Sequence, residues 1–404
     1  MSNFFNAIGV ADMEKVHSAV IGWLLSDKCN AFDITQKSKI LCGLFNVGPS
    51  QFDKIDVNVE VYDIDILVTT KRNSLEECWI IENKIKSNQH DNQLDKYVRI
   101  INGIEETSGK NPKPITEKYR HIPDGNQHYC FLTLIKETPI GKYASKWINK
   151  RYDDLVQLLS PPLLFPLSIC SNADGVIFQQ YVSCITNMTN ALKDFLINPN
   201  NYPHVFTDGS KKKTEKEFSM IVNDHGRYAL YIAENGMETI FQKCYLGETW
   251  NRYRNTSHIY SKKPCNIDES NGKAMLDIIL PDIMDNNNNI YHTQIEFQDG
   301  SFKVQIHQVD DNWKNQTEAD KQTQKDVFLG IWEVFFKTVK NTMGKEWTKN
   351  SPDKNSLRPY LSLSKKVTDW LKDPNTLLEL WKDHFEECEK VMKELIQESG
   401  CKYY

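Results

Sequence analysis

The chain has 404 residues, of which 40% are hydrophobic and 25% are charged, and its formal net charge is -5 at pH 7. This length exceeds that of a typical single domain, so we expect two or three domains. The acidic balance argues against a protein that coats nucleic acid, because basic side chains supply most of the affinity of such proteins. The net charge does not exclude an acidic enzyme that binds phosphates through local lysines and a metal ion.

Cellular location is predicted from what the sequence lacks. It has no apolar run of about 18 residues, so we expect no transmembrane helix. Residues Met1–Met13 show no basic stretch followed by an apolar one, so we expect no secretory signal. The ten cysteines are scattered without a Cys-x-x-Cys pair. They are typical of reduced thiols in a cytoplasm, and a zinc site is not expected.

The first half of the chain alternates between helix-like and strand-like patterns. We predict helices over 12–26, with Asp12 as N-cap, and over 36–45; strands over 57–62, 64–69 and from 78; a helix over 87–101; a strand over 129–135; and helices over 152–159 and 173–196. The first two strands could also form one long bent strand. This order predicts an α/β fold with a mixed central sheet flanked by helices.

A change of composition marks the predicted domain boundary. Asn198–Asn201, with prolines at 199 and 203, is followed by the lysine run 211–213, which we interpret as a solvated linker. The predicted domains are therefore residues 1–200 and 201–404. For the second we predict an α+β fold, with strands over 228–233, 276–280, 291–297 and 302–309, a hairpin turn at Asp299-Gly300, and helices over 319–340, 363–370 and 375–397.

Ionisable residues gather on two of the predicted strands. Side chains alternate between the faces of a strand, so Glu82 and Lys84 share one face and Asn83 lies opposite. If the strands pair through the turn at 71–77, Asp65 can converge with Glu82. Two carboxylates and a backbone carbonyl, that of Asn83, would suit Mg²⁺. Lys84 could then orient or deprotonate a water molecule and stabilise charge on a phosphate.

The surroundings of this pair favour a function over an incidental ion pair. Apolar residues flank Glu82 and Lys84 on both sides, from Trp79 to Ile85. Burying two charges costs several kcal/mol unless they are paired or bound to a metal. The alternative is an exposed ion pair on an edge strand, which is the usual meaning of an isolated Glu-x-Lys triplet.

Four segments together resemble the PD-(D/E)XK nuclease superfamily, most closely its RecB-like branch, in which a Gln-x-x-x-Tyr helix follows the catalytic strand. They are Glu14-Lys15-Val16-His17-Ser18, Asp65-Ile66-Leu67-Val68, Ile81-Glu82-Asn83-Lys84-Ile85 and Gln93-Leu94-Asp95-Lys96-Tyr97. The resemblance covers about residues 12–136 and extends toward 197, without reaching the C-terminal half. One departure is Ile64, which stands where the motif has proline.

The resemblance implies a restriction-endonuclease-like fold and hydrolysis of phosphodiester bonds with Mg²⁺ or Mn²⁺. It implies that Asp65 and Glu82 bind the metal and act in catalysis with Lys84, and that Glu14 is an accessory metal ligand. Gln93 and Tyr97 would border the site and contact the substrate. The expected partner is nucleic acid, DNA rather than RNA, in prokaryotic defence or genome maintenance. Asp63 competes with Asp65, because both would lie on one strand face.

Other interpretations of the chain remain open. The first domain could be a degenerate nuclease fold that only binds nucleic acid or protein. Alternatively, the second domain could sense a protein or small-molecule activator and trigger the first. Residues 214–404 hold no second Asp…Glu-x-Lys set, since Gln298 follows Glu296 where a lysine would be needed. His17 is interpreted as a core histidine. Association into a homo-oligomer is neither predicted nor excluded.

Overall fold

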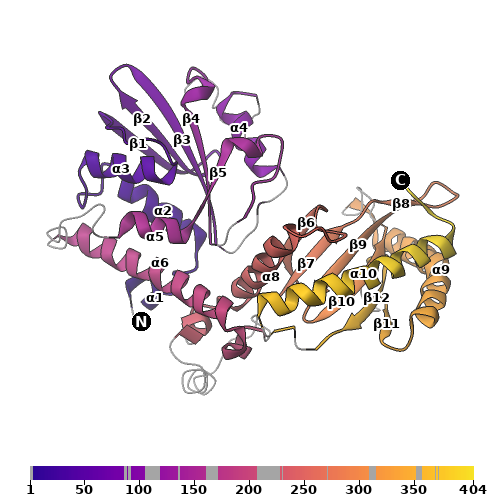
Figure 1. Ribbon diagram of the computed structural model, residues 1–404. Coiled ribbons are helices and arrows are strands. Elements are labelled where there is room, and N and C mark those ends of the chain that lie inside the picture. Colours follow the sequence, from indigo (N-terminus) through magenta and orange to yellow (C-terminus); the bar gives the residue numbers. More distant parts are fainter. Residues whose placement is uncertain are drawn as a thin grey trace. The chain divides into compact units, whose positions relative to one another are not determined.

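The computed structural model describes residues 3–85, 89, 92–104, 119–134, 137–160, 172–206, 228–229, 231–270, 272–308, 315–351, 357–368, 370–371 and 373–404. Backbone contacts divide the chain into two compact units (Figure 1). Unit 1 is Met1–Asp194 with Lys213–Ile240, and unit 2 is Phe195–Lys212 with Phe241–Tyr404. The domain bounds 1–200 and 201–404 stay a prediction. The predicted linker lysines 211–213, the first residues of the helix predicted over 87–101, and Ile135 and Val309 lie outside the described residues.

Unit 1 is built on a five-stranded sheet in the order β1-β2-β3-β4-β5. The strands are β1 (Lys54–Val61), β2 (Ile64–Arg72), β3 (Leu75–Lys84), β4 (Gln127–Thr133) and β5 (Trp147–Arg151). Strands β1, β2 and β3 pair antiparallel, whereas β3, β4 and β5 pair parallel. The sheet is therefore mixed, as the sequence predicted.

Helices cover both faces of this sheet. They are α1 (Phe4–Ala7), α2 (Glu14–Leu25), α3 (Ile34–Leu44), α4 (Gln93–Ile101), α5 (Tyr152–Leu159) and α6 (Ala173–Ile197), with short 3-10 turns at Asp124–Asn126 and Ala144–Lys146. On one face, Leu94 and Val98 of α4 pack into a hydrophobic cluster with Ile80, Tyr129 and Trp147. Helices α2 and α3 lie on the other face, where Phe45, next to α3, contacts Trp79 edge-on. The α/β prediction is confirmed.

A tight turn decides how β1 and β2 are arranged. Val61 pairs with Ile64, and the two residues between them have positive φ, 59° at Tyr62 and 63° at Asp63. Such a two-residue turn matches the twist of a hairpin. The alternative of one long bent strand is therefore wrong. Helix α2 starts at Glu14 with Met13 as its N-cap, so the assignment of Asp12 as N-cap is also wrong.

Unit 2 contains a second sheet of eight strands, with the main order β11-β12-β10-β9-β7-β6 and with β8 and β13 attached beside β9. Its strands are β6 (Cys265–Ser270), β7 (Lys273–Ile279), β8 (Ile283–Met284), β9 (Ile290–Gln298), β10 (Ser301–His307), β11 (Trp347–Asn350), β12 (Tyr360–Lys366) and β13 (Lys402–Tyr403). Every pairing is antiparallel.

The helices of unit 2 pack on one face of this sheet. They are α8 (Glu238–Arg254), α9 (Glu318–Met343) and α10 (Pro374–Ser399), with short 3-10 turns at Pro199–Asn201 and Pro203–Phe206. Trp381 of α10 contacts Phe297 of β9, and Trp332 of α9 contacts Tyr291 of the same strand. The α+β prediction is confirmed.

Two predicted elements of the second half are wrong. Residues 228–229 and 231–234 are helical rather than strand. The helix predicted over 363–370 is wrong, because residues up to Lys366 belong to strand β12, in which Leu361 and Leu363 lie on one face and Ser362 and Ser364 on the other. The predicted turn at Asp299-Gly300 is confirmed, with φ of 49° and 70°. Among the described residues, none of the helices combines the length and apolar composition needed to cross a bilayer.

Candidate active site

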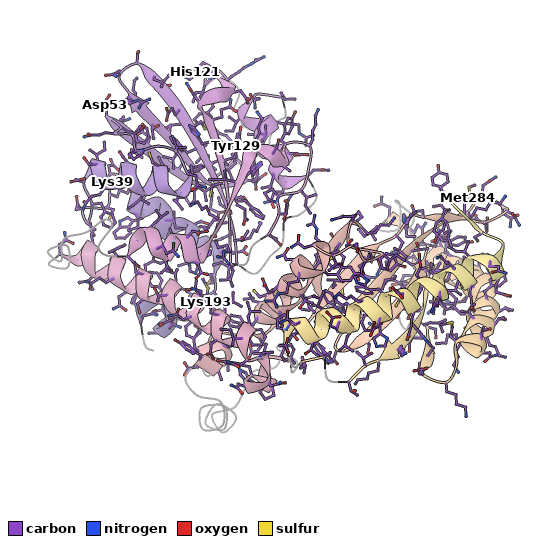
Figure 2. The ribbon with its side chains drawn as sticks, in the orientation of Figure 1. Lys39, Asp53, His121, Tyr129, Lys193 and Met284 are labelled. Atoms are coloured by element: carbon purple, nitrogen blue, oxygen red, sulfur yellow. The ribbon has the colours of Figure 1, made fainter. Side chains whose placement is uncertain are left out.

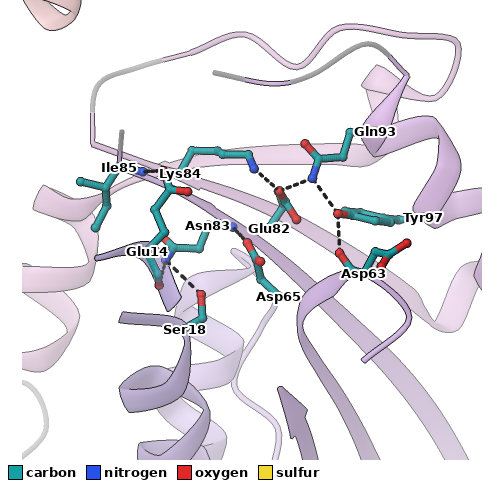
Figure 3. Close-up of polar contacts among 10 residues, drawn as sticks. All are labelled: Glu14, Ser18, Asp63, Asp65, Glu82, Asn83, Lys84, Ile85, Gln93 and Tyr97. Atoms are coloured by element: carbon teal, nitrogen blue, oxygen red, sulfur yellow. Dashed lines mark hydrogen bonds and ion pairs between the residues drawn. The ribbon is translucent and has the colours of Figure 1, made fainter. Parts of the chain in front are cut away.

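Three ionisable side chains meet near the ends of β2 and β3 (Figure 3). Ile66 pairs with Ile81, so the next position outward places Asp65 opposite Glu82. Nζ of Lys84 lies 2.7 Å from Oε1 of Glu82. Glu82 is 0% exposed and Lys84 is 8% exposed, and β3 lies inside the sheet between β2 and β4. The alternative of an exposed ion pair on an edge strand is therefore wrong.

The Glu82 carboxylate has one oxygen in use and one unused. Oε1 accepts hydrogen bonds from Nζ of Lys84 and, at 2.7 Å, from Nε2 of Gln93. Oε2 is buried and has no hydrogen-bond partner. Burial raises the pKa of Glu82 to about 8, and the negative charge of Asp65 adds to this effect. Since buried polar atoms nearly always have partners, the bare oxygen fits a site for a cation.

Asp65 lies beside this oxygen in a similar environment. Its Oδ2 accepts a hydrogen bond of 2.7 Å from the backbone N–H of Asn83. Burial raises the pKa of Asp65, although that hydrogen bond and the charge of Lys84 work in the opposite direction. Two buried carboxylates facing each other disfavour their own ionisation, and a divalent cation between them would reverse that.

The oxygen donors present fit Mg²⁺ or Mn²⁺. Among the residues that the structure describes, no three His, Cys, Asp or Glu side chains form a group that could hold a metal ion. The protein would therefore contribute two carboxylates, and a backbone carbonyl and water would complete the shell. Mg²⁺ is commonly bound in this way, because it keeps several of its waters.

Glu14 and Asn83 connect helix α2 to the end of β3. Oε1 of Glu14 accepts a hydrogen bond of 2.8 Å from the backbone N–H of Ile85. The side chain of Asn83 points to the face opposite Glu82, as predicted. There its amide donates to the carbonyl oxygen of Glu14 and to Oγ of Ser18, both at 3.1 Å. The roles of Glu14 and of the Asn83 carbonyl as metal ligands stay predictions.

Gln93 and Tyr97 of α4 are bonded within the protein. Nε2 of Gln93 lies 2.7 Å from Oε1 of Glu82 and 2.7 Å from Oη of Tyr97. Tyr97, which is 1% exposed, donates a hydrogen bond of 2.6 Å to the carbonyl oxygen of Asp63. These contacts hold Glu82 and the β1–β2 turn against α4. A direct contact with substrate stays a prediction for both residues.

Asp63, the alternative to Asp65 as a metal ligand, lies apart from the carboxylate pair. It occupies the β1–β2 turn, and its side chain pairs with Nζ of Lys96 at 2.8 Å. The turn changes the direction of the chain, so Asp63 and Asp65 do not share a strand face.

Two buried hydroxyls near the site have contacts that the sequence did not predict. Ser18 lies one helical turn after Glu14, a spacing that could have suggested a shared face. Tyr152 begins α5 and donates a hydrogen bond of 2.8 Å to Oδ1 of Asn83. The two residues are 69 positions apart in the sequence, so no local sequence pattern predicted this contact. His17 is a core residue, as interpreted: Nε2 donates to the carbonyl oxygen of Ala11, Nδ1 accepts from Tyr181, and burial lowers its pKa to about 4.

Comparison with known protein families gives one result. Residues 2–163 match the PD-(D/E)XK nuclease superfamily. This match confirms the predicted resemblance of this part of the chain to that superfamily. Glu82-Asn83-Lys84, on β3, is the only Asp/Glu-x-Lys triplet within the matched residues. Searches of curated proteins and of solved structures each found no match. The RecB-like branch and its Gln-x-x-x-Tyr helix stay a prediction.

Proposed function

We propose that the chain hydrolyses phosphodiester bonds in nucleic acid, with DNA as the preferred substrate and Mg²⁺ or Mn²⁺ as the cofactor. The observation that carries the proposal is the Glu82 carboxylate. One of its oxygens is held by Lys84 and Gln93, and the other is buried without a partner next to Asp65. The match of residues 2–163 to a nuclease superfamily supports the proposal, because both carboxylates lie within the matched residues.

Asp65 and Glu82 would hold the metal, which when bound polarises a phosphate oxygen and lowers the pKa of bound water. Burial alone would lower the pKa of Lys84, but the carboxylates of Glu82 and Asp65 more than offset this and raise it. Lys84 is therefore an ammonium at neutral pH. It can donate hydrogen bonds to the attacking water or to the charge that develops on the phosphate.

The cofactor and the substrate are tested together. The full chain is incubated with single- and double-stranded DNA and with RNA, each with Mg²⁺, Mn²⁺, Ca²⁺ or excess chelator. We expect cleavage of DNA with Mg²⁺ or Mn²⁺ and none with chelator, because oxygen ligands select hard cations. Full activity in chelator would exclude the metal mechanism, and cleavage of RNA alone would make the substrate assignment wrong.

A second candidate is a nuclease that unit 2 controls. It is favoured by the position of the family match, which ends at residue 163, and by the separate sheet and core of unit 2. In this proposal the chain is inactive until a protein or small molecule binds unit 2. The metal affinity of the resting chain would then be normal while its cleavage rate stays at background. From the family resemblance, we propose that the protein acts in prokaryotic defence or genome maintenance. A role in defence is tested by measuring whether the protein protects cells against phage infection.

A further inference from the structure

Asn83 stands between the two motif residues Glu82 and Lys84 and has all of its polar side-chain groups in use. It is 0% exposed. Its amide nitrogen donates to the carbonyl oxygen of Glu14 and to Oγ of Ser18, and its amide oxygen accepts from Oη of Tyr152. Its backbone N–H donates to Asp65. One residue therefore joins α2, β2 and α5 directly behind the carboxylate pair. Figure 3 shows its contacts with α2 and β2.

The bond from Tyr152 fixes which way the Asn83 amide points. A phenol that donates to an amide oxygen forces the amide nitrogen to the opposite side. That side is α2, where Glu14 and Ser18 supply the two acceptors. If the phenol oxygen were missing, Oδ1 of Asn83 would be a buried acceptor without a donor, which destabilises this orientation of the amide. The amide would then no longer hold α2 in one place.

The position of α2 matters because Glu14 lies beside the site. Its carboxylate is bound to the N–H of Ile85, and its negative charge acts on both Asp65 and Lys84. A shift of α2 would move this charge relative to the carboxylate pair. Tyr152 is itself firmly held, since it is 0% exposed and its ring lies edge-on to His17 with centroids 5.4 Å apart.

We propose that Tyr152 and Asn83 are positioning residues that set Glu14 and Asp65 for metal binding. Neither side chain touches the metal position; they act through the residues that surround it. This inference rests on the proposed function, because it takes the carboxylate pair to be a metal site. Hydrogen-bond partners of metal ligands typically change metal affinity on the order of 10-fold or more when they are removed.

The test replaces one hydroxyl in the full chain. Tyr152→Phe removes the bond to Asn83 and keeps the ring. The matched control is Tyr129→Phe on β4 of the same sheet (Figure 2), because Tyr129 is also buried, at 2% exposure, and donates one hydrogen bond of 2.7 Å to Gln127. Binding of Mn²⁺ is measured by calorimetry without nucleic acid, and thermal unfolding is measured in chelator.

We expect both variants to lose some thermal stability in chelator, because each loses a buried hydroxyl that is hydrogen-bonded. Only Tyr152→Phe should raise the Kd for Mn²⁺, on the order of 10-fold. Equal affinity for Mn²⁺ in wild type and Tyr152→Phe would overturn the inference. If Tyr152→Phe does not fold, Ser18→Ala replaces it, since it removes one acceptor from the same amide, and an unchanged Kd in that variant is equally decisive.

The outcomes separate this inference from the proposed function. A wild-type chain that binds Mn²⁺ but cleaves no nucleic acid contradicts the function, and the Tyr152 comparison still decides the inference. A chain that cleaves while Tyr152→Phe binds Mn²⁺ as tightly as wild type contradicts the inference alone. A wild-type chain that binds no divalent cation contradicts both.

Discussion

At the scale of single residues, the candidate site depends on buried charges. Glu82 and Lys84 pair inside the protein, and the cost of removing such a pair from water is offset only by good geometry and further partners. A pair whose carboxylate keeps one bare oxygen is poorly optimised for stability. This arrangement supports the proposed binding of a cation.

The first prediction concerns the three site residues. Asp65→Asn, Glu82→Gln and Lys84→Met should each reduce cleavage to background, and combining them should add little, because they act as one unit. The matched control is Glu77→Gln, which makes the same change on the same strand but on the opposite face. Initial rates on a fixed DNA substrate check this. Wild-type activity in any of the three would remove that residue from the site.

The second prediction uses the buried His17. Burial lowers its pKa to about 4 in the folded chain, against 6.5 for an exposed histidine. Below pH 6.5 the unfolded chain takes up a proton that the folded chain does not, so stability falls as the pH falls from 6.5 to 4. Between pH 7.5 and pH 5 this amounts to about 2 kcal/mol.

The free energy of unfolding of unit 1 within the full chain, measured with urea at pH 7.5 and pH 5, gives this loss. His17→Gln cannot take up the proton, so its loss between the two pH values should be smaller than that of wild type by about 2 kcal/mol. The same pH dependence in both proteins would mean that His17 is protonated in the folded chain.

At the scale of elements, hairpin turns set which side chains meet. In unit 2, Gly300 has a φ of 70° in the β9–β10 turn, and a Cβ there would lie 2.4 Å from Nε1 of Trp370. Gly400 has nearly the same φ, 68°, at the end of α10, and its nearest neighbour would be 3.9 Å away. The two glycines therefore share the backbone strain but differ in available space.

The third prediction follows from this difference. Gly400→Ala should cost about 1 kcal/mol, the penalty for a side chain at positive φ. Gly300→Ala should cost clearly more, because Trp370 must also move. Thermal unfolding followed by tryptophan fluorescence gives both values. An equal loss of stability in both variants would show that the Trp370 ring moves without a cost in free energy.

The convergence of Asp65 with Glu82 was predictable from the sequence, because a short hairpin and strand alternation are local rules. The bond between Asn83 and Tyr152 was not, since it links residues 69 positions apart and no local pattern marks it. Strand β12 was mistaken for a helix because Leu361-Ser362-Leu363-Ser364 is short and lies next to lysines that suit either structure.

Contacts between neighbouring strands also could not be predicted from sequence motifs. The sequence offered no lysine two residues after Glu296. The structure supplies one from the next strand, because Lys303 pairs with Glu296 across the β9–β10 hairpin and their side chains are in contact. Asp277 faces Glu296 from β7, where burial, with a smaller effect of Glu296, raises its pKa to about 7. Charge placement in a sheet follows register as much as sequence order.

At the scale of the whole molecule, the chain divides into two units. The domain boundary predicted from the sequence carries the fourth prediction. The asparagine- and proline-containing stretch from 198 to 213 should be cut first in limited proteolysis, because few contacts cross such a boundary. Mass spectrometry of the first fragments locates the cut. A first cut within β4 or between β7 and β10, with none near 198–213, would contradict the predicted domain bounds.

The separate cores of the two units have a consequence for how the protein melts. Each unit has its own sheet and its own buried aromatic residues, so unfolding should appear as two heat-absorption peaks rather than one. A ligand that binds only the folded form raises the temperature of the peak to which its site belongs. The carboxylate pair lies in unit 1, so Mn²⁺ should shift one peak and leave the other in place, and the cation thereby identifies which peak is the nuclease fold.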